Sequence, residues 1–469
     1  MAHSQTPPAS PLELPTADVR AYVEAHRARF LGELSDFLRI PSVSTDPERR
    51  EEVRRAADFL LDKLADLGFK TERLETPGHP VVFAERRVSA DLPTVLVYGH
   101  YDVQPPEPLE LWAAPPFEPT VRGGKLYARG ASDDKGQLYA HVKGVETLLA
   151  LSGTLPVNVK FLLEGEEEIG SPNLLPLIER HRERFAADVV LISDGAMAAP
   201  ETPTITYGLK GLAYVEVWVR GAAMDLHSGA FGGAAPNPID GLAKMIAALH
   251  DETGRVAVPG FYDAVVDITP EEREVFGRAP FDEAALAQEL GVSALPGEAG
   301  YTVLERLWAR PTLDCNGIGG GFQGEGSKTV IPSQAMAKIS CRLVPNQTPE
   351  EITRKLSDYL KALAPEGLSV EVKDLHGGDP AVTPLTSRAV QAAGRALEAV
   401  YGRPVVFART GGTIPVGSTF QKVLGADVVF VGMGLESDRA HSPNEKFDLV
   451  NLYRGIETSA ALFRALATL

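Results

Sequence analysis

The sequence predicts an α/β protein in which helices sandwich a mixed sheet and a second, α+β domain interrupts the first. Two observations predict this fold. Short β-rich apolar runs alternate with helical stretches as far as about residue 205, which is typical of a sheet covered on both faces. After Ile205, stretches such as AYVEVWVRG and AMAKISCRLV alternate polar and apolar residues, as half-solvated antiparallel strands do.

The first domain begins with two amphipathic helices, expected at 17–39 and 47–67, in which Leu and Phe return at three- and four-residue spacing. Gly68 follows the second helix as a stop signal. Four apolar runs then read as strands: PVVFAE, TVLVYGH, VNVKFLLE and DVVLIS. Helical stretches at about 135–151 and 171–184 alternate with them. In such sheets the functional residues gather where the strands end.

The second domain is expected to be an insert. Helical stretches at about 236–250 and 348–363 accompany its alternating strands, whereas 254–310 is too mixed to assign. The α/β pattern then returns in two helical segments, near 386–401 and 448–468, and in the run VVFVGMG between them. We therefore expect the first domain at 1–205 and 386–469, and the insert at 206–385.

Length and charge limit the possible functions. A chain of 469 residues is too long for one ordinary core. Its net charge of −17 disfavours nucleic-acid partners, whose binding depends on Lys and Arg. Two cysteines do not form a disulfide framework, and neither a secretory signal nor an apolar run long enough for a membrane span is visible. We therefore expect a cytoplasmic protein that does not bind membranes.

The first candidate site lies at the end of TVLVYGHYD. His100 and Asp102 are two residues apart, so on a strand they face the same side. A histidine that binds a metal commonly needs a carboxylate to fix its tautomer, and Asp102 is suitably placed. A surface histidine beside an aspartate explains this pair equally well.

The remaining candidates also follow predicted strands or lie in loops. Asp133 precedes a helical stretch, where an N-cap explains it; Asp194 begins an Asp-Gly pair that is typical of turns. Adjacent carboxylates in FLLEGEEEIGS repel each other, which a solvated loop tolerates and a dication would relieve. His441 has the ordinary alternative of a loop histidine. Together these residues form the ligand set of a binuclear Zn²⁺ or Mn²⁺ site.

Two competing enzyme classes can be set aside. GIGGGFQGEGSKT approaches a phosphate-binding loop, but Ser327 separates Gly326 from Lys328, and the next segment reads as a strand. A serine hydrolase is not supported, because no G-x-S-x-G elbow is present.

The motifs, taken in order, resemble a known family. GHYDVQP, RGASDDKGQ, LEGEEEIGS, ISDG and AHSPNEKF resemble the aminoacylase, glutamate carboxypeptidase and carnosinase family of dinuclear metallopeptidases. DLHSGAFGG, TVIPSQAMAKISCRLVPN, HGGDP and TGGTIPV look most like its cytosolic non-specific dipeptidase and carnosinase branch. The resemblance runs from about residue 20 to the C-terminus and implies a catalytic domain with two divalent metal ions and an inserted lid domain through which subunits dimerise.

The resemblance also implies roles for individual residues. One metal is expected on His100 and Asp194, the other on Glu168 and His441, with Asp133 bridging them. Glu167 is the expected general base and Asp102 the residue that orients His100. The Asp133–Asp134 peptide is often cis in relatives. Zn²⁺ is the expected ion, with Mn²⁺ or Co²⁺ as alternatives.

The insert resembles a lid that contributes to substrate binding. His227 resembles a histidine that relatives place in the neighbouring subunit's active site. The other expected pocket residues are Thr329, Arg342, His376, Gly412 and Thr413. Thr413 stands where the dipeptidase branch commonly has serine, and the loop around 195–199 lacks the bulkier residues expected there, which leaves the substrate preference open.

These implications favour a homodimeric dipeptidase that hydrolyses the amide bond of dipeptides with a metal-activated water. An N-acyl amino acid deacylase of the same family remains an alternative. A non-catalytic metal-binding relative is the alternative from another class, although every expected ligand and base position is occupied.

Overall fold

The computed structural model describes residues 16–412 and 415–469, and these divide into two compact units. The first unit comprises the described residues up to Tyr207 together with Thr383–Phe407 and Thr419–Leu469, and the second comprises Gly208–Val382 and the described residues within 408–418. The second unit thus includes a short late segment that the sequence pattern assigned to the first domain. Within the described ranges, no helix is both long and apolar enough to cross a membrane.

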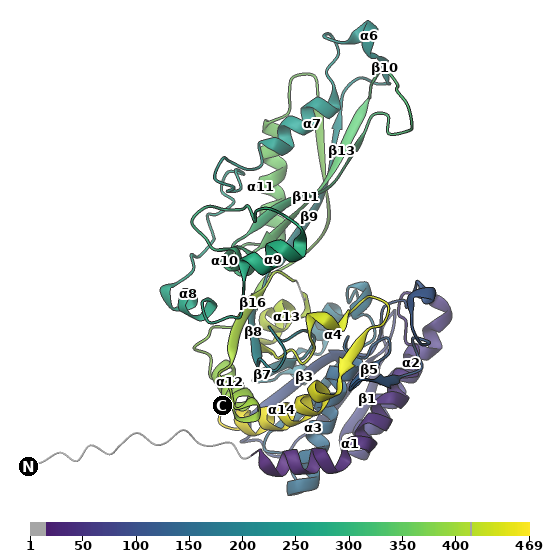
Figure 1. The fold of residues 1–469 in the computed structure, drawn as a ribbon, viewed down its shortest axis with the longest axis vertical. Helices are drawn as coiled ribbons and strands as arrows, with labels where there is room; N and C mark the ends of the chain where they lie inside the picture. Colours follow the sequence, from purple (N-terminus) through teal and green to yellow (C-terminus); the bar gives the residue numbers. More distant parts are fainter. Residues whose placement is uncertain (1–15, 413–414) are drawn as a thin grey trace, which may run out of the picture. The chain divides into compact units, whose positions relative to one another are not determined.

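A large mixed sheet forms the centre of the first unit (Figure 1). Its strand order is β1-β2-β6-β3-β7-β17-β8-β15, and β16 also pairs with β8. β3 runs parallel to β6 and β7, and β17 runs parallel to β7, whereas β1, β2 and β8 pair antiparallel. The strands are β1 Lys70–Leu74, β2 Val81–Arg86, β3 Thr94–His100, β6 Asn158–Glu164, β7 Val189–Ile192, β8 Thr204–Leu209, β15 Ala381–Val382, β16 Val406–Thr410 and β17 Asp427–Phe430. A small sheet, β18-β5-β4, is built from β4 Thr120–Arg122, β5 Lys125–Tyr127 and β18 Lys446–Asp448.

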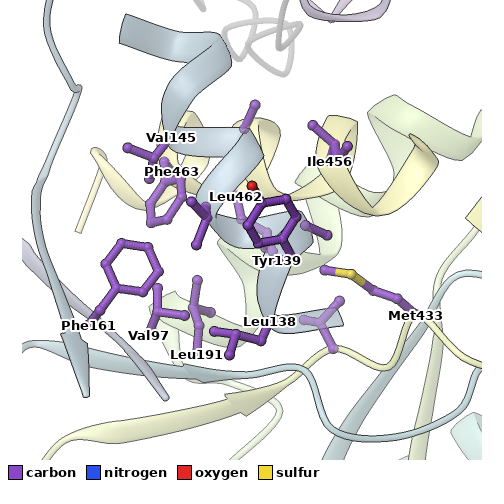
Figure 2. Close-up of a cluster of buried hydrophobic side chains, with 14 of the residues drawn as sticks. Val97, Leu138, Tyr139, Val145, Phe161, Leu191, Met433, Ile456, Leu462 and Phe463 are labelled. Atoms are coloured by element: carbon purple, nitrogen blue, oxygen red, sulfur yellow. The ribbon is translucent and has the colours of Figure 1, made fainter. Parts of the chain in front are cut away.

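Helices cover both faces of the large sheet. On one face, Val97 and Phe161 pack in the main core with Leu138 and Phe463 from two of the helices (Figure 2). On the other face, the ring of Tyr98 contacts Phe420, because successive side chains of a strand point to opposite sides. The helices of this unit are α1 Ala17–Leu38, α2 Arg50–Asp66, α3 Lys135–Ser152, α4 Leu174–Arg180, α5 Arg182–Phe185, α12 Arg388–Tyr401 and α14 Leu449–Leu466. The sandwiched sheet predicted from the sequence is therefore confirmed.

The second unit is built on an antiparallel sheet in the order β11-β13-β9-β14. Alternate residues of β9 and β13 are buried, as the alternation of polar and apolar residues predicts, and they pack against apolar residues of α7 and α11. Its strands are β9 Gly211–Arg220, β10 Leu226–His227, β11 Thr312–Gly320, β12 Val330–Ile331, β13 Gln334–Leu343 and β14 Ser369–Gly378. Its helices are α6 Ser228–Phe231, α7 Pro238–Ala247, α8 Pro270–Phe276, α9 Glu283–Leu290, α10 Val303–Trp308 and α11 Pro349–Ala362; a further helix, α13 Pro415–Thr419, runs across the boundary of the units in the chain.

Candidate functional site

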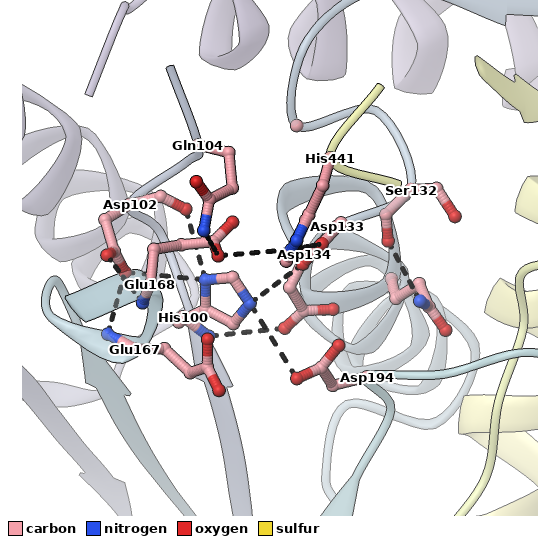
Figure 3. Close-up of polar contacts among 12 residues, drawn as sticks. His100, Asp102, Gln104, Ser132, Asp133, Asp134, Glu167, Glu168, Asp194 and His441 are labelled. Atoms are coloured by element: carbon pink, nitrogen blue, oxygen red, sulfur yellow. Dashed lines mark hydrogen bonds and ion pairs between the residues drawn. The ribbon is translucent and has the colours of Figure 1, made fainter. Parts of the chain in front are cut away.

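The site residues of the first unit gather where its parallel strands end. His100 is the last residue of β3. The strands β6 and β7 both pair with β3 in parallel, and they end at Glu164 and Ile192. Parallel strands bring their carboxyl ends to the same edge of a sheet, so the residues that follow them meet there. Glu167 and Glu168 follow β6, and Asp194 follows β7 (Figure 3).

The first group of potential metal ligands is His100, Asp133 and Asp194. Nε2 of His100 lies 3.1 Å from Oδ1 of Asp133 and 3.8 Å from Oδ2 of Asp194. His100 is fully buried, and this nitrogen makes no hydrogen bond within the described residues. A buried imidazole nitrogen without a hydrogen-bond partner, facing two carboxylates, matches the chemistry of a metal ligand.

The second group is Asp133, Glu168 and His441. Nε2 of His441 lies 2.9 Å from Oδ2 of Asp133 and 3.2 Å from Oε2 of Glu168. Oε1 of Glu168 is buried, and residues 16–412 and 415–469 offer it no hydrogen-bond partner. Asp133 belongs to both groups and directs one oxygen to each histidine, which is the arrangement of a bridging carboxylate. The Asp133–Asp134 peptide is cis, as the sequence resemblance implies.

Asp102 contacts both sides of this site. Nδ1 of His100 lies 3.1 Å from the backbone carbonyl oxygen of Asp102 and 3.4 Å from its carboxylate. The backbone amides of Glu167 and Glu168 donate to the two carboxylate oxygens of Asp102, at 3.2 and 3.1 Å. The closer contact to His100 is thus made by the backbone carbonyl of Asp102. The buried carboxylate of Asp102 instead holds the backbone of the acidic segment, and this second contact could not be predicted from the spacing of His100 and Asp102.

Burial disfavours the charged form of two carboxylates of the site. Burial raises the pKa of Glu167 to about 8; the proximity of His100 opposes this shift, and Asp194 and Glu168 add to it. Burial likewise raises the pKa of Asp194 to about 6. Hydrogen bonds to Asp133 and Glu168 raise the pKa of His441 to about 10. Buried carboxylates of this kind are stabilised as anions when a cation lies among them.

Two supporting residues were not singled out in the sequence. Nε2 of Gln104 donates to Oε2 of Glu168 at 2.6 Å, and Glu445 is a fully buried carboxylate beside the Asp133 loop. Both lie inside motifs that were recognised, GHYDVQP and AHSPNEKF, but only the folded backbone shows what they contact. Glycine at position 99 is also required, because a Cβ there would lie 2.8 Å from Oδ2 of Asp134.

The candidate residues of the second unit lie in two places. His227 in β10 pairs with Val330, next to Thr329, and its exposed ring accepts a hydrogen bond from the amide of Gly229. Arg342 lies near the far end of β13, about eight residues from its start, which at about 3.3 Å per residue is more than 25 Å along the strand. Within one copy of this unit, His227 and Arg342 are therefore not brought together.

The remaining predicted pocket residues lie on β14 and after β16. His376 is exposed on β14, where its ring packs edge-on against Tyr214 at a centroid distance of 5.1 Å. Gly412 is exposed just after β16, and its amide donates to Oγ1 of Thr410 at 3.3 Å. Thr413 lies outside the described residues.

The chain is similar to known proteins over most of its length. The family model described as peptidase family M20/M25/M40 matches residues 96–465. The Cys-Gly metallodipeptidase of Schizosaccharomyces pombe is 34% identical and covers 95% of this chain and 97% of its own length. The Beta-Ala-His dipeptidase of Rattus norvegicus is 33% identical, covering 96% and 95% respectively. Among solved structures, an M20 family metallo-carboxypeptidase from Sulfolobus solfataricus is 37% identical with a TM-score of 0.82, over 94% of this chain and 99% of that one.

Proposed function

Because this chain belongs to peptidase family M20/M25/M40 and is a metallopeptidase, we propose that it is a dipeptidase that hydrolyses the amide bond of dipeptides. The observation that carries the proposal is the pair of ligand groups that share Asp133 at the carboxyl edge of the large sheet. Full-length relatives named Cys-Gly and Beta-Ala-His dipeptidases support the substrate class.

The residues of the site fit two divalent cations. Each ligand group contains one buried atom that has no hydrogen-bond partner among the described residues. These atoms are Nε2 of His100 in the first group and Oε1 of Glu168 in the second. His100 and Asp194 would hold one ion, Glu168 and His441 the other, and Asp133 both. Nitrogen and carboxylate oxygen ligands suit Zn²⁺, which we propose as the ion, with Mn²⁺ and Co²⁺ as alternatives. Two such cations make water nucleophilic near neutral pH and polarise the scissile carbonyl.

Glu167 is the proposed general base, because it lies beside both ligand groups and belongs to neither. Its carboxylate takes one proton from the attacking water as oxygen bonds to the amide carbon. The same proton is then delivered to the leaving amine as the C–N bond breaks, giving a free carboxylate and a free amine.

Asp102 supports this role through the backbone. Its carboxylate accepts the amides of Glu167 and Glu168, so that it holds the general base and its neighbouring ligand in one orientation. We propose that Asp102 acts in this way in addition to orienting His100.

We further propose that the second unit is the lid and dimerisation domain, and that Thr329, Arg342, His376, Gly412 and Thr413 bind substrate. The planar guanidinium of Arg342 suits the substrate carboxylate, since it can bind both oxygens. His227 is proposed to act in the neighbouring subunit of a homodimer, stabilising the developing oxyanion. The exposure of His227 supports this arrangement, as does the position of Arg342 at the opposite end of β13 from the start of that strand.

Complementation tests the trans role of His227. His227→Ala and Asp133→Ala subunits should each be inactive alone, and mixing them should restore part of the activity, because one active site of the mixed dimer then has both residues. Mixed dimers verified by differently tagged subunits that stay inactive would show that each subunit works alone.

A substrate panel tests the main proposal. The metal-reconstituted enzyme should hydrolyse dipeptides, including Cys-Gly and β-Ala-His, faster than N-acyl amino acids. Longer peptides belong in the panel, because the Sulfolobus relative is named a carboxypeptidase. Preferred release of the C-terminal residue from longer peptides would favour that second function, and turnover of N-acyl amino acids alone would favour a deacylase.

A further inference from the structure

A buried carboxylate joins the loop that carries Asp133 to the loop that carries His441. Glu445 is four residues after His441 and has no solvent exposure. Its side chain accepts hydrogen bonds from the segment that leads into α3, 312 to 316 residues earlier in the chain. One short segment therefore supplies the His441 ligand and also contacts the backbone of the shared ligand.

Each carboxylate oxygen of Glu445 accepts two hydrogen bonds. Oε2 accepts from Nη1 of Arg129 at 2.8 Å and from the amide of Gly130 at 3.0 Å. Oε1 accepts from the amide of Ser132 at 2.9 Å and from the amide of Asp133 at 3.1 Å. All four partners are donors, so the position requires a group that accepts on both of its oxygens.

Backbone contacts hold Glu445 itself in place. Its carbonyl oxygen accepts the amide of Ala128 at 3.2 Å, and the following strand, β18, pairs with β5. Because these contacts fix the backbone at Glu445, its carboxylate links the His441 segment to the backbone of Asp133. A surface loop could not do this, since exposed hydrogen bonds are readily exchanged with water.

We propose that Glu445 is a positioning residue for the metal centre: it holds the Asp133 backbone at a fixed place relative to His441, so that both ligand groups form together. This rests on the proposed two-metal function. Outer contacts of this kind commonly change metal affinity by about 10- to 100-fold when they are removed.

Glutamine at position 445 separates this role from simple packing. Glu445→Gln keeps the shape of the side chain, but its NH₂ group faces two donors whichever way the amide is turned. The matched control is Glu457→Gln, which neutralises another buried glutamate of the same unit; Glu457 pairs with Arg20 in the packing of α1 against α14. Both variants are purified as full-length protein, stripped with a chelator and compared by far-ultraviolet circular dichroism.

Co²⁺ binding measures the effect directly. Calorimetric titration and the visible absorption of bound Co²⁺ report affinity and ligand geometry without a substrate. We expect two Co²⁺ per chain in the wild type and in Glu457→Gln. In Glu445→Gln we expect at least 10-fold weaker binding of both ions and an altered visible spectrum, with a native circular dichroism spectrum.

Unchanged Co²⁺ affinity and spectrum in Glu445→Gln would overturn the positioning role while leaving the metal site intact. Absence of Co²⁺ binding in the wild type would instead overturn the proposed function. If Glu445→Gln does not fold, Glu445→Asp replaces it, because the charge beside Arg129 is kept while the shorter side chain cannot reach both pairs of donors. Wild-type Co²⁺ affinity in Glu445→Asp would equally overturn the proposal.

Discussion

His141 should make the first unit sensitive to acid. It lies in α3 with 1% of its surface exposed, and its ring nitrogens lie 3.0 Å from Oγ of Ser459 and 2.8 Å from Oγ of Ser193. Burial lowers the pKa of His141 from 6.5 to about 4, because no acidic group compensates the charged form. The folded protein therefore keeps His141 neutral in a range of pH where the unfolded chain protonates it.

The sign and size of the effect follow from linkage. Between pH 6.5 and about 4 the unfolded state binds the extra proton, so stability is complete above this window and falls as the pH falls through it. A pH of 5 is about 1.5 units below the pKa of histidine in the unfolded chain, whereas His141 in the folded protein is still mostly neutral at this pH. The difference in proton binding favours unfolding by about 2 kcal/mol.

Replacement by glutamine removes the titration and keeps polar contacts to both serines. The free energy of unfolding of metal-free protein is measured by urea denaturation at pH 8 and at pH 5. We expect the loss of free energy between these two pH values to be about 2 kcal/mol smaller in His141→Gln than in the wild type. His250→Gln, at an exposed histidine, is the control and should follow the wild type. Equal acid losses in His141→Gln and wild type would refute the reasoning.

Three further predictions concern the site. Glu167→Gln should bind two metal ions normally but lose at least about 100-fold in kcat, as expected for loss of a general base; near-normal turnover would exclude that role. Gly136→Ala should destabilise the protein, because its Cβ would lie 1.9 Å from the carbonyl oxygen of Ala131, and thermal unfolding should show a Tm lowered by several degrees relative to Gly32→Ala, where a Cβ would meet open space. Chelation should abolish dipeptide hydrolysis, and Zn²⁺, Mn²⁺ or Co²⁺ should restore it; activity that persists in verified metal-free protein would contradict the two-metal proposal.

The sequence indicated the large sheet because its buried strands are short apolar runs separated by helical periodicity. It also indicated the strand-end ligands, since His100 and Asp194 stand at or just after such runs. It did not indicate that 171–184 breaks at His181 into two helices, because helical periodicity continues across that residue. Likewise, the pairing of β16 with β8 is a contact between distant segments that local pattern does not encode.

The unassigned stretch 254–310 contained signals that could have been used. Thr269 with Glu272, and Thr302 with Glu305, form capping boxes at the starts of α8 and α10. These helices are only seven and six residues long, too short for apolar periodicity to stand out. The role of Glu445 was inaccessible for a different reason: its partners are mostly backbone amides, which every residue except proline carries.

The order of the ligands along the chain has a consequence for biosynthesis. Translation reaches His100, Asp133, Glu168 and Asp194 long before it reaches His441 and the core helix α14. Domains tend to fold as units during translation, so a nascent chain that has not yet reached His441 carries an incomplete acidic centre. A premature stop codon before position 441 would therefore yield a polypeptide in which Asp133 and Glu168 lack the histidine of their ligand group.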